Sequence, residues 1–173
     1  NENSDAAVDE TRGMVARYGE KIATCFYYSS NGGASEASST VWGGNQSTYP
    51  YLLGVIDPYE ATVADQIGGY NWTRTYSASD LTDKLNAKGY KCATIKSVKV
   101  SSYTDTGNPK TVTFTDADGK NYTLTARAMV TMLSLRSYHY DFGGSQPSGI
   151  PVNEDTVLPD LSGLYAIDGD GNL

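Results

Sequence analysis

Residues 95–135 constrain the fold most, because their apolar residues follow first the period of strands and then that of a helix. Two runs, 95–103 and 111–125, are rich in strand-forming residues, and a turn sequence at 116–119 interrupts the second run. Side chains alternate along a strand, so one face should collect the apolar residues from both sides of this turn. The predicted cross-strand neighbours set Val112 and Phe114 opposite Tyr122 and Leu124. The stretch therefore predicts antiparallel hairpins.

A helix is expected directly after these strands. Thr125 can cap its first turn, and the helix is predicted to run to Leu135. Apolar side chains recur there at helical spacing, which is typical of a face buried in a core. The residues of this stripe are Met129, Met132, Leu133 and Leu135.

The clearest helix signal lies at residues 79–89. Either Ser77 or Ser79 can act as its N-cap, Asp80 falls in the first turn, and Gly89 ends the pattern. Each of these signals agrees with the direction of the helix dipole.

Strand signals also occur near both ends of the chain. Residues 11–18 and 22–28 predict an N-terminal hairpin around a turn at 19–21, and both faces of its second strand are apolar enough to predict burial. Residues 164–167 predict one more strand. All elements together predict an α+β fold, in which two short helices pack on antiparallel β-hairpins.

The chain of 173 residues is long enough to bury one sizeable core, and we treat it as one compact unit. We expect the main domain to cover residues 1–142, followed by a loop-rich tail at 143–173 that belongs to the same unit. No run of eighteen apolar residues is present, and residues 1–5 lack the basic and apolar regions of a signal peptide. The sequence as given predicts neither a membrane span nor its own export signal.

The charge of the chain argues against nucleic acid as a partner. The net charge is -7 and the pI about 4.6, whereas binding to a phosphate backbone needs clustered Lys and Arg. The 14 Tyr and 2 Trp residues supply rings that could stack on sugars. Tyr is also a common strand residue, and we expect most of these rings to serve that purpose.

The residues that usually hold metals are scarce. The chain has two cysteines, Cys25 and Cys92, and a single His139, so we expect no zinc site and no cofactor. A disulfide between the two cysteines and a pair of buried free thiols are both compatible with the sequence. We interpret His139 as a partly buried polar aromatic residue. The Asp-rich turns at 116–119 and 168–172 lack the final Glu of a calcium loop and are interpreted as turns.

Residues 29–46 interrupt the strand pattern with a loop rich in Ser and Gly. We expect this loop to be ordered on the surface, because large apolar side chains follow it closely. Glu36 is the one acidic residue of the loop, and carboxylates serve as acid or base in glycan cleavage when an apolar pocket raises their pKa. An acid on a polar loop is usually solvated, so the residues alone do not single out Glu36 as catalytic.

Three stretches carry a recognisable pattern. Residues 11–15 match T-x-G-x-V, residues 27–36 match most of Y-H-S-x-S-G-G-x-T-E, and residues 50–60 match most of P-Y-L-x-x-V-x-D-P-x-D. In this order and spacing, the chain resembles the stage II sporulation protein D / LytB family. These are secreted bacterial proteins that act on cell-wall peptidoglycan. Weaker matches continue at residues 95–100 and 127–137.

The resemblance implies lytic transglycosylation by the parent protein. A protonated Glu would donate to the glycosidic oxygen after N-acetylmuramic acid, and the same carboxylate would then deprotonate the muramyl 6-hydroxyl to close a 1,6-anhydro ring. Family members carry this Glu upstream, in an A-A-E-M-P segment that does not occur in these 173 residues. We therefore expect no catalytic residue in this chain, with Glu36 as the only candidate, and we expect the chain alone to be inactive.

The resemblance also implies which residues form the wall of a glycan-binding groove. The predicted substrate-binding residues are Tyr28, Ser29, Ser30, Gly32, Gly33, Glu36, Trp42 and Asp57. Trp42 could stack on a sugar or anchor the loop, and both interpretations stay open. Some members bind zinc through a His in this region, which is Tyr28 here, so that capacity is not expected.

Three functions fit these observations. The first is a portion of a peptidoglycan lytic transglycosylase, extracellular or in the cell wall of a Gram-positive-type bacterium, with glycan strands as its partner. The second is a non-catalytic module that binds wall glycan or enhances a cell-wall amidase. The third is an adhesin-like surface domain, for which only the Tyr-rich strands and the acidic surface argue.

Overall fold

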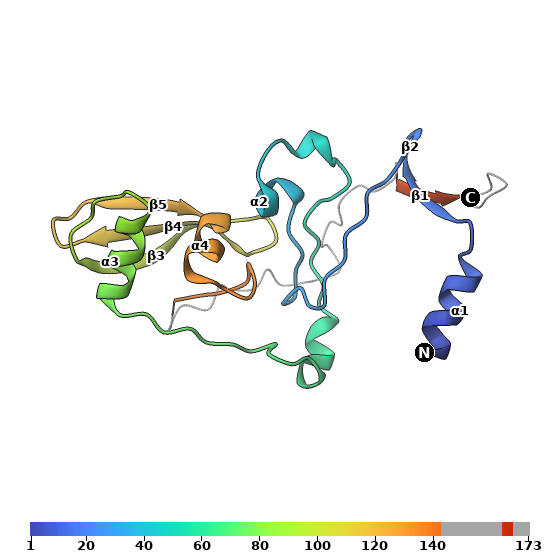
Figure 1. Ribbon diagram of the computed structural model, residues 1–173, viewed down its shortest axis with the longest axis horizontal. Helices are drawn as coiled ribbons and strands as arrows, with labels where there is room; N and C mark the ends of the chain where they lie inside the picture. Colours follow the sequence, from blue (N-terminus) through green and yellow to red (C-terminus); the bar gives the residue numbers. More distant parts are fainter. Residues whose placement is uncertain (143–163, 168–173) are drawn as a thin grey trace. The chain divides into compact units, whose positions relative to one another are not determined.

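The computed structural model describes residues 1–142 and the strand at 164–167, and its fold is α+β as predicted (Figure 1). The described residues form two compact units. One contains residues 1–29 with the strand at 164–167, and the other contains residues 30–142. This division differs from the single unit that we expected. The predicted boundary after residue 142 lies at the edge of the described residues and stays a prediction, and the predicted loop at 143–149 lies outside them.

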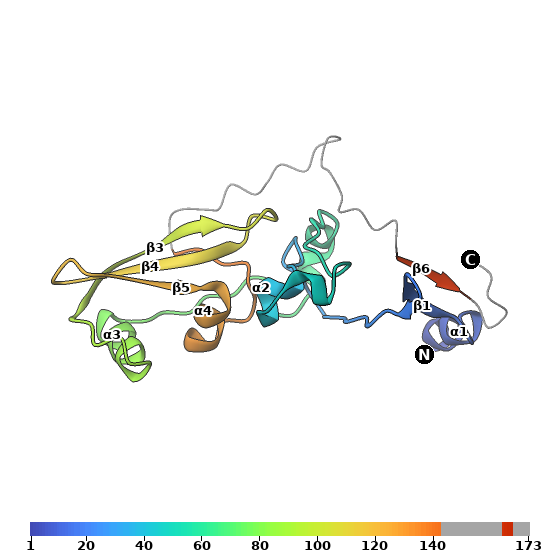
Figure 2. The ribbon, with the colours of Figure 1, turned by 90° about the horizontal axis from the view of Figure 1, so that it is seen from above.

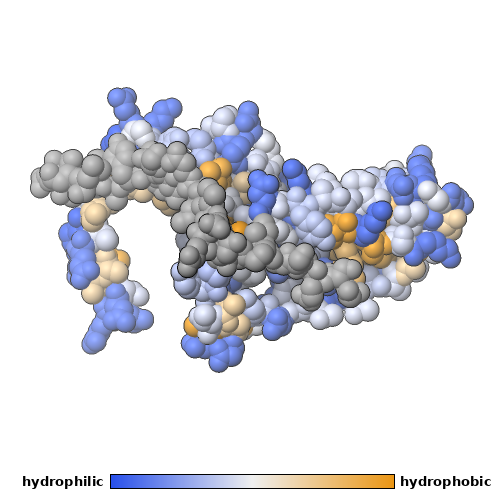
Figure 3. Space-filling model, turned by 180° about the vertical axis from the view of Figure 1, so that it is seen from behind, coloured by the Kyte–Doolittle hydropathy of each residue, from blue (hydrophilic) through white to orange (hydrophobic). Residues whose placement is uncertain are grey.

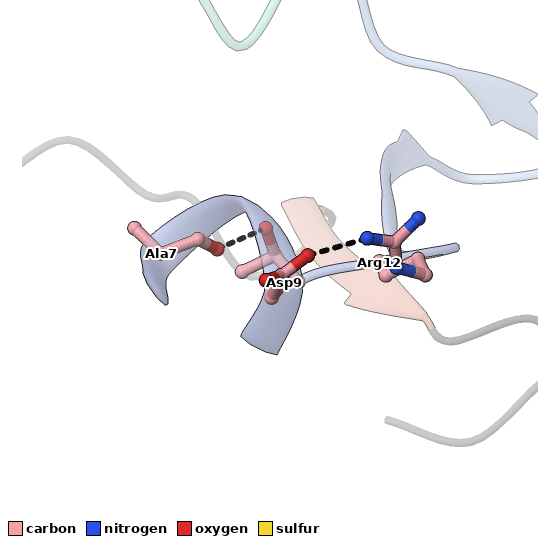
Figure 4. Close-up of polar contacts among 4 residues, drawn as sticks. Ala7, Asp9 and Arg12 are labelled. Carbon is pink, nitrogen blue, oxygen red and sulfur yellow. Dashed lines mark hydrogen bonds and ion pairs between the residues drawn. The ribbon is translucent and has the colours of Figure 1, made fainter. Parts of the chain in front are cut away.

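The first unit holds a small antiparallel sheet. Its strands are β1 (Val15–Tyr18), β2 (Lys21–Ile22) and β6 (Leu164–Ile167), in the order β2-β1-β6. The predicted strand at 164–167 is thus confirmed. Helix α1 (Glu2–Glu10) precedes the sheet and is stabilised locally, because it buries none of its residues. At its C-terminal end, Thr11 donates its hydroxyl to the Ala7 carbonyl and Arg12 pairs with Asp9 (Figure 4).

The predicted N-terminal hairpin exists, but it is much shorter than expected. Its second strand ends at Ile22, and residues 23–28 form no strand. The expected burial of this segment is wrong, since Ile22 is 70% and Tyr27 is 98% exposed. Strand-forming side chains on both faces imply burial only when another layer covers them, and residue periodicity does not reveal whether that layer exists.

The second unit contains the main sheet. Its strands are β3 (Ile95–Tyr103), β4 (Pro109–Asp116) and β5 (Asn121–Thr125), paired antiparallel in that order. The predicted cross-strand neighbours are confirmed, because Val112 pairs with Leu124 and Phe114 pairs with Tyr122.

Helices α3 (Ala78–Ala87) and α4 (Ala126–Leu133) lie on the same face of this sheet (Figure 2). Both predicted N-caps are confirmed. Ser77 accepts from the Asp80 backbone in a reciprocal capping box, and Thr125 accepts from the Ala128 backbone. The buried core residues between helices and sheet are Leu85, Cys92, Ile95, Val112, Phe114, Tyr122, Leu124, Met129, Met132, Leu133 and Tyr140.

The predicted turn after β4 is also confirmed, and its buried Asp116 holds it together. The carboxylate accepts from the backbone of Ala93, Asp118 and Lys120 and from the Tyr122 hydroxyl at 2.9 Å. Burial and the bond to Asp116 raise the pKa of Tyr122 to about 12.

The two cysteines differ in their surroundings. Cys92 is a buried free thiol in the core, as one of the two interpretations expected, whereas Cys25 is an exposed free thiol. Among the residues coloured by hydropathy in Figure 3, most are hydrophilic or neutral, and the hydrophobic ones form small patches. None of the helices in the described residues has the length and apolar character needed to cross a membrane.

Candidate functional site

The Gly-rich loop of residues 30–36 is held by backbone pairing with residues 52–57. The amide of Asp57 donates to the Gly33 carbonyl at 2.8 Å, and the amide of Ser35 donates to the Val55 carbonyl at 2.8 Å. An isolated bridge joins Ala34 to residue 56 between these two bonds. The loop is therefore ordered, as predicted, because its backbone groups find partners in a neighbouring strand-like segment.

The tip of the loop wraps around the carboxylate of Glu60. That carboxylate accepts from the backbone amides of Asn31 at 3.0 Å, Gly32 at 2.6 Å and Gly33 at 3.2 Å. Successive amides can converge in this way because Gly32 and Gly33 adopt φ of +70° and +101°, which side chains disfavour. The amides of both glycines are thus engaged within the chain.

Asp57 supports the same loop tip through a hydrogen bond from Asn31. It accepts from the Asn31 side-chain amide at 2.9 Å, while the Asn31 side-chain oxygen accepts from the Gly33 backbone at 2.7 Å. The bond from Asn31 lowers the pKa of Asp57, against the opposing effect of burial and with help from backbone amides of Tyr59 and Glu60. Asp57 is therefore a residue that shapes the loop.

Glu36, at the end of the loop, is anchored to the turn between β3 and β4. Its Oε1 atom accepts from the Thr104 hydroxyl at 2.7 Å, from the Thr106 hydroxyl, and from the Asn108 side-chain amide at 2.8 Å. Its Oε2 atom has no hydrogen-bond partner among the residues that the structure describes. The side chain is partly buried, so it is less solvated than an acid on a polar loop usually is.

Asn108 links Glu36 to His139. Its side-chain oxygen lies 2.8 Å from Nδ1 of His139, and only 1% of Asn108 is exposed. His139 also packs on the loop, because a Cβ atom added to Gly32 would lie 3.3 Å from the Cβ atom of His139. His139 as a residue is exposed, whereas we expected it to be partly buried.

An aromatic row begins at the end of α2 (Ser38–Trp42) and continues just after the 3-10 helix η1 (Gln46–Thr48). Trp42 meets Tyr49 edge to face, with ring centroids 6.5 Å apart, and Tyr49 meets Tyr51 in the same way. Trp42 is 43% exposed, so its ring both belongs to the row and is partly open to solvent. Arg127 on α4 donates to the Trp42 carbonyl.

Tyr138 fastens this row to the segment that carries His139. Its hydroxyl donates to the Val41 carbonyl at 3.0 Å. Burial raises the pKa of Tyr138, and the nearby Glu36 carboxylate adds to that effect while Arg127 opposes it.

The structure brings together five of the predicted substrate-binding residues through these contacts, namely Gly32, Gly33, Glu36, Trp42 and Asp57. Ser30 precedes them in the same unit and is partly buried, whereas Tyr28 and Ser29 belong to the first unit and are exposed. Sequence reasoning missed Thr104, Thr106, Asn108 and Gln46. Gln46 bonds Ser39 with its side-chain oxygen and the Leu52 carbonyl with its amide, which fixes α2 beside the loop.

The site offers neutral hydrogen-bonding groups, one carboxylate oxygen and an exposed ring. Such a set suits a polar, uncharged ligand with hydroxyl groups and flat apolar faces. The described residues contain no group of three or more His, Cys, Asp or Glu side chains that could hold a metal ion.

Comparison with curated proteins finds a similarity to a protein of one class, the amidase enhancers. A protein named Amidase enhancer, from Bacillus subtilis (strain 168), is 42% identical over 84 residues, which cover 49% of this chain and 10% of that relative. This similarity supports the resemblance to the stage II sporulation protein D / LytB family. The match spans about a tenth of the relative's length. No family model matches the chain, and no solved structure matches it.

Proposed function

We propose that this chain is a portion of a secreted protein of the bacterial cell wall, and that it contributes the glycan-binding groove of a parent protein of the lytic transglycosylase type. The similarity to an amidase enhancer supports a role at the cell wall. The motifs of residues 27–36 and 50–60 support the narrower assignment to peptidoglycan glycan strands.

The anchored carboxylate of Glu36 is the observation that carries this proposal. Three donors hold its Oε1 atom, and Oε2 has no partner within the described residues. A carboxylate fixed in this way is a directed acceptor for a hydroxyl or amide N–H of a ligand. Trp42 adds an exposed ring that can stack on the apolar face of a sugar, and the Tyr138 hydroxyl joins the neighbouring Val41 carbonyl to the segment that carries His139.

In the parent protein, the cleavage step would belong to a Glu outside these residues. That Glu would protonate the glycosidic oxygen and then deprotonate the muramyl 6-hydroxyl, and the present chain would hold the glycan in place. Glu36 and Trp42 would bind and orient the strand. Because the cleaving Glu would lie outside these residues, this chain alone would not cleave the strand.

The alternative is a non-catalytic module that binds wall glycan or enhances a cell-wall amidase. The name of the matched relative favours it. The proposed function and the glycan-binding form of the alternative both require the glycan surface, and they differ in whether the parent protein makes 1,6-anhydro products.

Co-sedimentation with purified peptidoglycan tests the shared step. We expect the chain to bind, and we expect Trp42→Ala to weaken binding about tenfold, equivalent to ~1.4 kcal/mol. Tyr59→Ala is the matched control, because Tyr59 is 78% exposed and is not one of the predicted binding residues. Equal binding by wild type and Trp42→Ala would remove Trp42 from the site, and no binding by wild type would refute the proposal.

Mass spectrometry of digested peptidoglycan separates the two functions. Anhydro-muropeptides from the full-length parent, and none from this chain, are the expected result. Their absence from both digests would favour the amidase-enhancing module, whereas products from this chain alone would make Glu36 catalytic.

A further inference from the structure

Asn108 is a buried amide whose orientation is set by chemistry alone. An ionised carboxylate only accepts hydrogen bonds, so the group 2.8 Å from Glu36 Oε1 must be the Asn108 NH2 group. The amide oxygen of Asn108 must then face His139. With 1% of the residue exposed, water does not compete for either end.

The oriented amide in turn selects the tautomer of His139. The Asn108 oxygen is an acceptor, so Nδ1 of His139 must carry the proton in the 2.8 Å bond between them. A neutral imidazole holds only one ring proton, and its Nε2 atom is then an unprotonated acceptor. His139 is exposed, and no described residue bonds its Nε2 atom.

We propose that Nε2 of His139 accepts a hydrogen bond from a hydroxyl or acetamido N–H of an N-acetylhexosamine glycan, and that Asn108 is the residue that positions it. The identity of this ligand rests on the proposed function. His139 was not among the residues that the family motifs indicate.

Two features of the site support this role. Glu36 and His139 bond to opposite ends of one side-chain amide, so Glu36 Oε2 and His139 Nε2 are two acceptors held by a single rigid group. A sugar ring carries neighbouring hydroxyl and acetamido donors that suit such a pair. The missing side chain of Gly32 leaves the space in which the imidazole packs on the loop, since a Cβ atom there would approach His139 to 3.3 Å.

A purely structural role would be different. In that case the bond between Asn108 and His139 would only tie residues 137–142 to the turn after β3. Two substitutions separate the roles, because the Nδ2 atom of Asn occupies about the place of His Nδ1, whereas the amide of Gln reaches about the place of Nε2. His139→Asn keeps the bond to Asn108 and removes the outward acceptor, and His139→Gln keeps a polar group at the outward position.

NMR of the chain labelled with ¹⁵N-histidine tests the positioning step without any glycan. The sequence contains one His, so a single imidazole is observed. At a pH where the ring is neutral, we expect a protonated Nδ1 and an unprotonated Nε2. Glu36→Gln should populate both tautomers, because the new amide can also donate a hydrogen bond to Asn108 and so allows the Asn108 amide to flip. Asn108→Ala should also populate both tautomers, because it removes the acceptor for Nδ1. A wild-type ring protonated at Nε2 would overturn the positioning.

Binding to peptide-free glycan strands, prepared by amidase digestion of peptidoglycan, tests the contact itself. We expect His139→Asn to weaken binding about tenfold and His139→Gln to weaken it less, because the Gln amide keeps an outward acceptor but loses the bond to Asn108. Wild-type affinity in His139→Asn, while Trp42→Ala still loses binding, would refute the contact and leave the proposed function standing. If wild type does not bind glycan, the proposed function and its ligand fail together, and the tautomer result still decides the role of Asn108.

Discussion

Gly54 lies so close to Thr106 that a Cβ atom built on it would stand 2.8 Å from the methyl carbon of Thr106. Thr106 also donates its hydroxyl to Glu36. Gly54 lies in the segment 52–57 that pairs with the Gly-rich loop, and Thr106 lies in the turn between β3 and β4 that anchors the Glu36 carboxylate. Because Gly54 has no side chain, this segment can approach that turn closely.

Substitution of Gly54 should destabilise this unit. We expect Gly54→Ala to lower the free energy of unfolding by about 1–3 kcal/mol, because the new methyl group overpacks a stiff β-branched neighbour. Urea titration followed by Trp fluorescence measures this, since both Trp residues, Trp42 and Trp72, lie in the second unit.

Two controls sharpen that experiment. Gly68→Ala should change stability by less than about 0.5 kcal/mol, because a Cβ atom at Gly68 meets nothing within 4 Å. Thr106→Ser in the Gly54→Ala background removes the clashing methyl, keeps the hydroxyl for Glu36, and should recover most of the loss. An unchanged stability in Gly54→Ala would show that the two segments can separate without cost.

The capping box of α3 makes a local prediction. Ser77→Ala should lower the free energy of unfolding by about 1 kcal/mol, because the backbone amide of Asp80 loses the acceptor it finds at 3.0 Å. Ser79→Ala, in the first turn of the same helix, is the matched control and should have little effect. Equal losses in both variants would argue that helix propensity, and not the cap, is being measured.

Asp116 should make the stability of the unit depend on pH. Burial alone would favour the neutral acid, but hydrogen bonds from Lys120, Tyr122, Ala93 and Asp118 outweigh it and hold the pKa below the ordinary value of 3.8. Its stabilisation is therefore present above 3.8 and is lost as the pH falls through the lower, folded-state pKa. The stability difference between wild type and Asp116→Asn, from urea titrations at several pH values, should shrink as the pH falls below that range. A difference that grows on acidification would contradict the direction of the shift.

The two thiols should react at different rates. Cys25 is exposed and Cys92 is 8% exposed in the core. A thiol reagent such as dithionitrobenzoate should modify Cys25 rapidly and Cys92 only on unfolding, and Cys25→Ser should remove the fast phase. Two protected thiols in the native protein, released together by a reductant, would indicate a disulfide instead.

The main sheet and its helices could be predicted from the sequence, because their signals are local. The alternation of apolar residues in 112–124 predicted the cross-strand neighbours. Ser77 and Thr125 predicted the starts of α3 and α4, because N-cap hydrogen bonds form within one helical turn. The prediction of a buried strand at 22–28 was wrong because burial is not a local property. It would have required segments from elsewhere in the chain to cover both faces of the strand.

The candidate site was only partly predictable. The glycines and Glu36 stood out as a motif, whereas Asn108 lies 72 positions from Glu36 and carries no periodic or motif signal. Polar contacts between distant segments depend on tertiary packing, which a single sequence does not encode in any regular pattern. The backbone amides of Gly32 and Gly33, two of the predicted substrate-binding residues, donate to the Glu60 carboxylate within the chain.

The carboxylate of Glu60 inside the loop tip has a consequence for the energetics of recognition. A loop with this many glycines would otherwise sample many conformations, and a ligand would have to select one of them at an entropic cost. Glu60, 28 positions downstream of Gly32, already accepts hydrogen bonds from the loop amides in the folded chain. The loop is therefore ordered during folding and not during ligand binding. The surface is preorganised, so a glycan would meet a nearly rigid partner, and affinity would depend on the contacts made and little on loop ordering.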